Sequence, residues 1–241
     1  ILKKLTNKNL TIMKKLILTF FVAFAALSIK AQTMAFTVLE IKVKQFTQDK
    51  IAEDFDNLFK DVKVNKGGIV LERIGRGRTE GMTHRLIFMS TLGVDLIDED
   101  AIDPNKNDAF WSKMRNYVEE WGPFYSGRIL SWQEGDTEKY SMGHIWDIKV
   151  TDQNQFKEGH DKIVSEFADD FKGRVVGFGT YDFGLPNGAT HWLALTGKDT
   201  NDHLLLYDKL EKNPKFIKLI SSRGKFELIK DFEINILKRK Q

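Results

Sequence analysis

Two short segments of this 241-residue chain alternate apolar residues with one acid and one lysine. The first segment carries Glu40 and Lys42, and the second carries Asp147 and Lys149. Alternation with a period of two is typical of a half-buried strand, so each acid and its lysine should share one face. If the apolar face packs against helices, the four charged groups meet in the interior, where they can orient a polar ligand.

Two further residues, Arg85 and Trp192, fall on a later strand of each half at positions that would face the same interior. A guanidinium and an indole add a cation and an apolar wall to the predicted pocket. The predicted ligand-binding set is therefore Glu40, Lys42, Arg85, Asp147, Lys149 and Trp192. The alternatives are a network of ion pairs that only fills the interior, because such networks also occur without a function, and a polar face that is open to solvent.

Three histidines are the other candidates for chemistry. His84 and His191 each follow the motif Gly-x-Thr at equivalent places in the two halves. A neutral imidazole can act as a general base, whereas a Thr-His pair can simply fix a turn through hydrogen bonds. Recurrence in both halves favours the turn, because a constraint of the fold repeats and an active site need not. His160 falls on the apolar stripe of a predicted helix, where a buried core histidine is the alternative to a ligand-binding one.

No metal site is predicted from these residues. The chain has no cysteine, which excludes thiolate ligands, disulfides and a cysteine nucleophile. The histidines form no close pair and no HExxH motif, and no serine lies in a Gly-x-Ser-x-Gly motif. The sequence therefore leaves open whether the protein is an enzyme.

The elements that position these residues occur twice along the chain. Each half begins with an alternating strand, continues with an apolar stripe of helical spacing, and then has the pattern strand, strand, helix, strand. The equivalent segments are 37–44 and 144–151, 51–62 and 156–167, 68–75 and 173–180, 83–90 and 190–197, 110–121 and 203–220, and 127–134 and 224–231. This order, β-α-β-β-α-β, is that of a ferredoxin-like unit with both helices on one face of an antiparallel sheet.

The predicted fold class is α+β. Residues 34–136 are expected to form a first ferredoxin-like repeat and residues 143–241 a second, with a short polar linker between them. Each sheet alone would leave one face bare, and a large exposed apolar face is unfavourable. Packing the two repeats sheet to sheet buries both faces and gives a pseudo-dimeric α/β barrel within one chain.

The tandem pattern, in which residues 145–150 (Ile-Trp-Asp-Ile-Lys-Val) run into a helix carrying Phe156 and His160, resembles the dimeric α/β-barrel superfamily. The resemblance implies a small-molecule ligand and a function like that of a cofactor-free monooxygenase, with no cofactor. Other members bind haem through a helical histidine, so the resemblance implies His160 as the ligand if haem binds. A haem-binding barrel protein and a non-catalytic binding or assembly module are the alternatives, because the fold does not choose among them.

The N-terminal segment has the pattern of an export signal. Met13, Lys14 and Lys15 precede a mainly apolar run, 16–27, and a small residue stands at position 31. A basic start, a short apolar run and a small residue at the cleavage site are typical of a secretory signal peptide. We therefore expect residues 1–31 to be removed; this range includes some residues upstream of the signal itself. The protein is expected to be periplasmic or secreted.

Removal of this segment would reverse the net charge. The whole chain carries +3, and residues 1–31 contain six lysines and no acid, which leaves −3 for the rest. Sequence-independent binding to nucleic acid needs clustered positive charge, so nucleic acid is not predicted as a partner. The predicted partner is a small molecule, with no membrane contact after cleavage, and the chain is expected to be a monomer or a homodimer.

Overall fold

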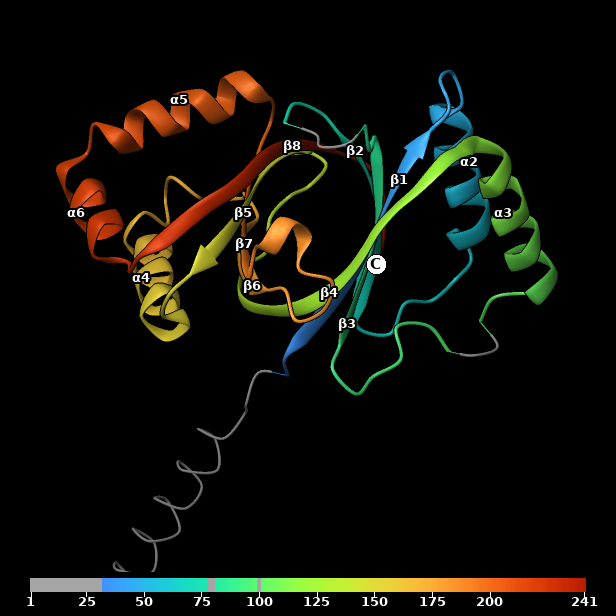
Figure 1. Ribbon diagram of the computed structural model, residues 1–241, viewed down its shortest axis with the longest axis horizontal. Coiled ribbons are helices and arrows are strands. Elements are labelled where there is room, and N and C mark those ends of the chain that lie inside the picture. Colours follow the sequence, from blue (N-terminus) through green and yellow to red (C-terminus); the bar gives the residue numbers. More distant parts are fainter. Residues whose placement is uncertain (1–31, 78–80, 99–100) are drawn as a thin grey trace, which may run out of the picture. The chain divides into compact units, whose positions relative to one another are not determined.

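The computed structural model describes residues 32–77, 81–98 and 101–241 (Figure 1). The predicted signal segment, 1–31, lies outside the described residues. None of the helices in the described part of the chain is long and apolar enough to span a membrane. In chain order the elements are β1 (Met34–Val43), α2 (Gln48–Phe59), β2 (Gly67–Ile74), β3 (His84–Thr91), α3 (Pro104–Tyr117), β4 (Val118–Gln133), β5 (Met142–Val150), α4 (Gln153–Glu166), β6 (Val176–Thr180), the short 3-10 helix η1 (Pro186–Gly188), β7 (His191–Gly197), α5 (Thr200–Glu211), α6 (Pro214–Ser222) and β8 (Phe226–Lys240).

The strands close into one antiparallel barrel in the order β1-β3-β2-β8-β5-β7-β6-β4. The first half of the chain contributes the run β4-β1-β3-β2, and the second half contributes the run β8-β5-β7-β6. The halves are joined edge to edge, because β2 pairs with β8 and β4 pairs with β6. Closure pairs the strand edges that an open sheet would leave exposed. The α+β class and the closed barrel agree with the prediction, and the two sheets meet along hydrogen-bonded edges.

Helices cover the barrel on two sides (Figure 1): α2 and α3 lie against the first-half sheet, and α4, α5 and α6 lie against the second. The side chains of β1 alternate accordingly. Ile41 and Val43 pack in a core with Phe55 of α2, whereas Phe36 and Val38 pack inside the barrel. Apolar side chains therefore fill two helix-side cores and the barrel interior.

The strands that join the two halves are longer than predicted. Strand β4 begins at Val118 rather than at residue 127, and β8 continues to Lys240 rather than to residue 231. Strand β4 pairs with β1 as far as Ile129 and with β6 from that residue onward. Each joining strand therefore has two partners in succession and needs the extra length to reach both.

The helical segment predicted at 203–220 is two helices, α5 and α6. The break falls at Pro214, which has no backbone N–H to continue α5 and is favoured in the first turn of a new helix. The side chain of Asn213 accepts hydrogen bonds from the backbone N–H groups of Lys215 and Phe216 and caps α6. The extra helix widens the layer that covers the second-half sheet.

Candidate functional site

Polar side chains meet inside the barrel and form what we call the polar layer. Its members are Glu40, Glu72, Arg85, Tyr125, Asp147 and Tyr181, all buried. Arg85 Nε donates to Glu72 Oε2 at 2.5 Å. The Tyr125 hydroxyl donates to Glu40 Oε1 at 2.9 Å, and the Tyr181 hydroxyl donates to Asp147 Oδ1 at 2.6 Å. Each member thus has a hydrogen-bond partner within the layer, as a buried polar network requires.

The pKa values of the polar layer follow from burial and these contacts. Burial raises the pKa of Asp147 to about 6, although the hydrogen bond from Tyr181 acts in the opposite direction. Burial also holds the pKa values of Tyr125 and Tyr181 well above their ordinary value. Burial alone would lower the pKa of Arg85, but the carboxylate of Glu72 outweighs it and raises the pKa. These are the contacts of a structural network, the alternative weighed from the sequence.

The prediction that Lys42 and Lys149 lie in this interior is wrong. Lys42 Nζ donates to Glu119 Oε1 at 2.8 Å, with about a third of its side chain exposed, and Lys149 is exposed. Glu40 on β1 and Asp147 on β5 are the last buried residues on the inward face of their strands. The lysine two residues further along each strand therefore reaches water. The interior acids are instead bonded by tyrosine hydroxyls from other strands, so the predicted acid–lysine pairs do not form.

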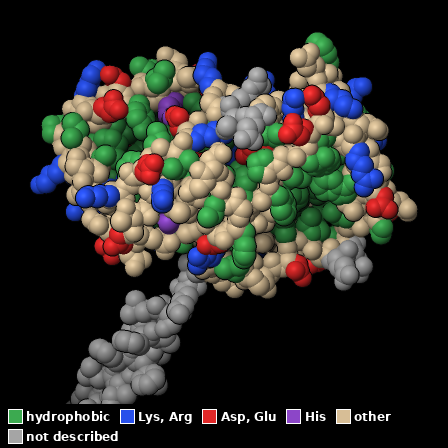
Figure 2. Space-filling view, viewed as in Figure 1, with side chains coloured by type: hydrophobic (Ala, Val, Ile, Leu, Met, Phe, Trp, Pro, Cys, Tyr) green, Lys and Arg blue, Asp and Glu red, His purple; other side chains and the backbone are tan. Residues whose placement is uncertain are grey.

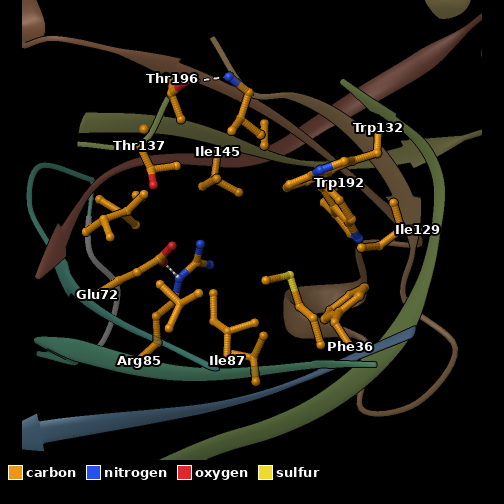
Figure 3. A pocket seen from close by; sticks show the side chains of 18 of the residues that line it. Phe36, Glu72, Arg85, Ile87, Ile129, Trp132, Thr137, Ile145, Trp192 and Thr196 are labelled. Atoms are coloured by element: carbon orange, nitrogen blue, oxygen red, sulfur yellow. Dashed lines mark hydrogen bonds and ion pairs between the residues drawn. The ribbon is translucent and has the colours of Figure 1, made fainter. Parts of the chain in front are cut away.

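Trp192 lies inside the barrel and lines a cavity of about 120 Å³, which we call the lumen (Figure 3). Arg85 of the polar layer also reaches the lumen. Glu40 and Asp147 line a different pocket, of about 200 Å³, together with Lys230. Of the six residues predicted to bind one ligand, the lumen brings together only Arg85 and Trp192.

The two Thr-His pairs face the helices rather than the lumen. Thr83 Oγ1 lies 2.9 Å from His84 Nδ1, and Thr190 Oγ1 lies 2.8 Å from His191 Nδ1. Each threonine hydroxyl also accepts a hydrogen bond from a backbone N–H at the end of the neighbouring strand, β1 or β5. Burial lowers the pKa of His84 to about 4 and also lowers that of His191. The pairs tie two strands together at equivalent places, which is the structural role weighed above.

A cavity of about 330 Å³ lies between the second-half sheet and helices α4 and α5, with α6 beside them; we call it the helix-side cavity. Figure 2 shows hydrophobic side chains gathered on this face of the molecule between α4 and α5. The cavity is lined mainly by apolar and aromatic side chains, among them Trp146, Ile163, Phe171, Leu195, Tyr207 and Phe216. Concave apolar cavities with a few polar groups are the usual sites for small molecules.

His160 of α4 is one of the few polar residues in the helix-side cavity. It is 4% exposed, and its ring centroid lies 5.7 Å from that of Phe178. Its Nε2 has no hydrogen-bond partner among the described residues. Burial, helped by the charge of Arg223, lowers the pKa of His160 to about 4, so the imidazole is neutral at pH 7. A neutral imidazole in this position can bind a metal ion or form one hydrogen bond to a ligand.

Arg223, which directly follows α6, lines the same cavity and was not predicted. It is 8% exposed, and its guanidinium lies 4.4 Å from the ring centroid of Phe156 and 5.1 Å from that of Phe226. Within the described part of the chain its Nε has no hydrogen-bond partner and no carboxylate pairs with it. Burial lowers the pKa of Arg223 to about 10. An arginine at a helix end is usually solvated, so no sequence signal distinguishes this one.

A second unpredicted cluster joins three elements of the second half. His144 Nε2 lies 2.9 Å from Asp231 Oδ2, and His144 Nδ1 lies 2.9 Å from His203 Nε2. The His144 ring stacks on Trp146, which lines the helix-side cavity. Burial lowers the pKa of both histidines, that of His203 to about 4. This chain of hydrogen bonds links β8, β5 and α5 and fixes the wall of the cavity at Trp146.

Comparison with known proteins identifies the fold. No family model and no curated protein sequence matches the chain. A Fusobacterium nucleatum protein provisionally described as a monooxygenase has a TM-score of 0.59 at 13% identity, over 88% of this chain and 95% of its own. A similarly described Lactobacillus acidophilus protein has a TM-score of 0.56 at 13% identity, over 87% of this chain and 96% of its own. An anthrone oxidase-like protein has a TM-score of 0.52 at 10% identity, over 88% and 94%. The chain therefore shares its fold with these proteins.

Proposed function

We propose that this chain is a small-molecule-binding α/β-barrel protein whose ligand occupies the helix-side cavity. The ligand is an apolar, mainly planar molecule that carries an anionic oxygen. One observation carries the proposal: among the described residues, Arg223 is buried without a carboxylate partner in an apolar cavity that His160 also lines, and Nε2 of His160 has no hydrogen-bond partner there.

The chemistry of the ligand follows from the groups that lack partners. A buried charge is unfavourable unless an opposite charge or hydrogen bonds compensate it. An anionic oxygen of a ligand would compensate Arg223, and the neutral imidazole of His160 would give that ligand one further hydrogen bond. The aromatic walls, which include Trp146 and Tyr207, would pack against the apolar body of the ligand.

A monooxygenase-like activity without a cofactor is the finer form of this proposal. Oxygenation of a phenol or an enol without a cofactor begins with its anion, and a nearby guanidinium stabilises that anion. The neighbours described as monooxygenases and as anthrone oxidase-like support this choice of chemistry. The ordinary Coulomb attraction is larger in an apolar cavity than in water, so Arg223 is well placed for this role.

Two measurements test the proposal. The fluorescence of 1-anilinonaphthalene-8-sulfonate, a planar apolar anion, should rise on binding, and Arg223→Met should weaken binding about tenfold or more. Arg128→Met is the matched control, because Arg128 is half exposed and paired with Asp182 away from the cavity. Oxygen consumption with anthrone should occur with the wild type and fall in Arg223→Met. Equal dye affinity in all three proteins would refute the proposal.

Haem is the second candidate ligand, favoured by His160. The residues fit the group: Nε2 of a buried neutral imidazole is free to ligate iron, and Arg223 can pair with a propionate. Bound haem would supply redox chemistry with oxygen or peroxide. Titration with haemin should give a Soret band that is lost in His160→Ala and kept in His203→Ala. If haemin gives no Soret band with the wild type, haem is rejected as the ligand. The proposal of an apolar anion is then tested by the dye-binding measurement alone.

We also propose that the protein is exported and that it consists of two ferredoxin-like repeats. The basic and apolar pattern of residues 13–31 supports secretion to the periplasm or beyond, and mass spectrometry of the protein recovered from cells would locate the mature N-terminus. The matching strand runs β4-β1-β3-β2 and β8-β5-β7-β6 support two ferredoxin-like repeats, 34–136 and 143–241. Light scattering would distinguish a monomer from a homodimer.

A further inference from the structure

We propose that the lumen is a second binding site, separate from the helix-side cavity, for a small apolar molecule that carries a hydrogen-bond acceptor. Its chemical class is a monocarboxylate with one aromatic ring or a short alkyl chain. The inference does not depend on the proposed function, because it concerns the inside of the barrel and not the space beneath the helices.

The lumen is enclosed by strands of both halves. Its apolar walls include Phe36, Ile87, Ile129, Trp132, Ile145 and Trp192, which surround the space drawn in Figure 3. Cavities lined by apolar side chains hold a compact apolar guest such as benzene when their volume is about 150 Å³. The 120 Å³ of the lumen therefore suits a single ring or a short chain.

Two glycines make room for the aromatic wall of the lumen. A Cβ on Gly179 would lie 2.5 Å from the ring of Trp192, and a Cβ on Gly177 would lie 2.9 Å from both Trp132 and Trp192. Strand β6 thus presents bare backbone against which the two indoles lie. Glycine alternates along this strand, Val-Gly-Phe-Gly-Thr, because the indole rings of Trp132 and Trp192 cover the glycine positions. Since the rings lie close against the strand, the space on their other side stays open as the lumen.

The polar atoms around the lumen that lack partners are donors. Trp192 Nε1 and Arg239 Nε are buried and have no hydrogen-bond partner among the described residues. Three acceptors that line the same space already have donors. Glu72 Oε2 accepts from Arg85, Thr196 Oγ1 accepts from a backbone N–H, and Thr137 Oγ1 accepts from the guanidinium of Arg239. Unpaired donors in an enclosed apolar space call for a ligand that brings acceptors, as a carboxylate does.

The lumen is separated from the helix-side cavity by the second-half sheet itself. On β7, Trp192 points into the barrel, whereas Leu193 of the same strand packs on the helix side with Phe156 of α4. The two spaces therefore have different polar groups, Arg239 and Trp192 in one and Arg223 and His160 in the other. A variant that fills one space should leave the other unchanged.

Fluorine NMR with 4-fluorobenzoate as the probe tests the proposal on the whole chain. Binding to the wild type should shift and broaden the probe signal. Ile87→Phe, which fills the lumen, should weaken binding about tenfold or more. Val164→Phe, which adds the same ring to the helix-side cavity, should leave the affinity unchanged. No binding at millimolar probe, or an equal loss in both variants, would overturn the proposal.

A second variant keeps the test independent of how well the first one folds. Arg239→Met removes the guanidinium at the edge of the lumen and keeps an unbranched apolar chain. It should weaken 4-fluorobenzoate about tenfold and leave the neutral probe fluorobenzene unaffected. An unchanged affinity for 4-fluorobenzoate contradicts the assignment of the carboxylate to Arg239. Any binding of 4-fluorobenzoate in the helix-side cavity should be lost in Arg223→Met and kept in Arg239→Met, so failure here and failure of the proposed function are distinguishable.

Discussion

Replacement of Arg223 by methionine should make the protein without ligand more stable and should weaken its binding of apolar anions. The two effects share one cause, because the guanidinium is buried without a carboxylate partner among the described residues and an anionic ligand would compensate its charge. Methionine keeps an unbranched apolar chain and removes both the charge and the contacts of the guanidinium with Phe156 and Phe226. A side chain with a purely structural role would not give opposite signs in stability and binding.

The magnitude follows from the pKa and the ring contacts. Burial lowers the pKa of Arg223 from 12.5 to about 10, and at 1.36 kcal/mol per pKa unit the charged form is disfavoured by about 3 kcal/mol. Loss of the two contacts between guanidinium and ring removes about 1–2 kcal/mol of stabilisation. Arg223→Met should therefore raise the free energy of unfolding by about 1–2 kcal/mol, which for a domain of this size raises Tm by roughly 2–8 °C.

Arg174→Met is the matched control for this measurement. Arg174 is similarly buried, at 7% exposure against 8%, but it donates to both carboxylate oxygens of Asp202 at 2.7 and 3.0 Å. Arg174→Met leaves the partly exposed Asp202 without its guanidinium and removes the hydrogen bond to the backbone oxygen of Thr196, which should cost about 1–3 kcal/mol. Urea denaturation should therefore move the two variants in opposite directions. If Arg223→Met is also destabilised and binds the dye as the wild type does, the inference from the unpaired charge is refuted.

Three further outcomes are expected from urea denaturation. The pKa of His160 is about 4 in the folded protein against 6.5 in the unfolded chain, so the folded state binds fewer protons below pH 6.5. The free energy of unfolding should therefore fall by about 2 kcal/mol between pH 7 and pH 5. His160→Phe should remove this part of the pH dependence. Gly179→Ala places a Cβ 2.3 Å from a backbone carbonyl oxygen and should cost about 1–3 kcal/mol, and an unchanged midpoint would contradict the close approach. Glu72→Leu leaves Arg85 uncompensated and should cost about 3–5 kcal/mol, whereas Lys42→Met should leave the unfolding midpoint unchanged, because the ion pair that it breaks is exposed to water.

The alternating strands were predictable because burial repeats with the period of the backbone. On β1 the sequence places Ile41 on the helix side and Glu40 inside, and both lie there. The same argument places Asp147 and Trp192 inside the barrel. Periodicity predicts on which face of a strand a side chain lies, but it does not predict how much of the strand is buried. It therefore could not show that Lys42 lies beyond the buried part of β1 and reaches water.

The partners of the interior acids could not be predicted from the sequence. Glu40 is bonded by Tyr125, 85 residues away, and Asp147 by Tyr181, 34 residues away. Both contacts depend on the register of β4 and of the segment after β6, and that register is set by closure of the barrel. Arg223 was missed for a related reason, because only the packed helices around it reveal that its charge is buried.

The two halves have matching strand orders but differ where a ligand would bind. The helix stripes place Phe55 and His160 at equivalent positions, each on the side of its helix that faces the sheet. In the first half that space is closely packed, with Phe55, Phe59 and Met114 in one buried cluster. In the second half the same layer contains a 330 Å³ cavity, and among the described residues Arg223 has no carboxylate partner and His160 Nε2 has no hydrogen-bond partner. A fold that needed only stability could fill both layers in the same way, so the difference between them supports the proposal that the ligand binds in the second half.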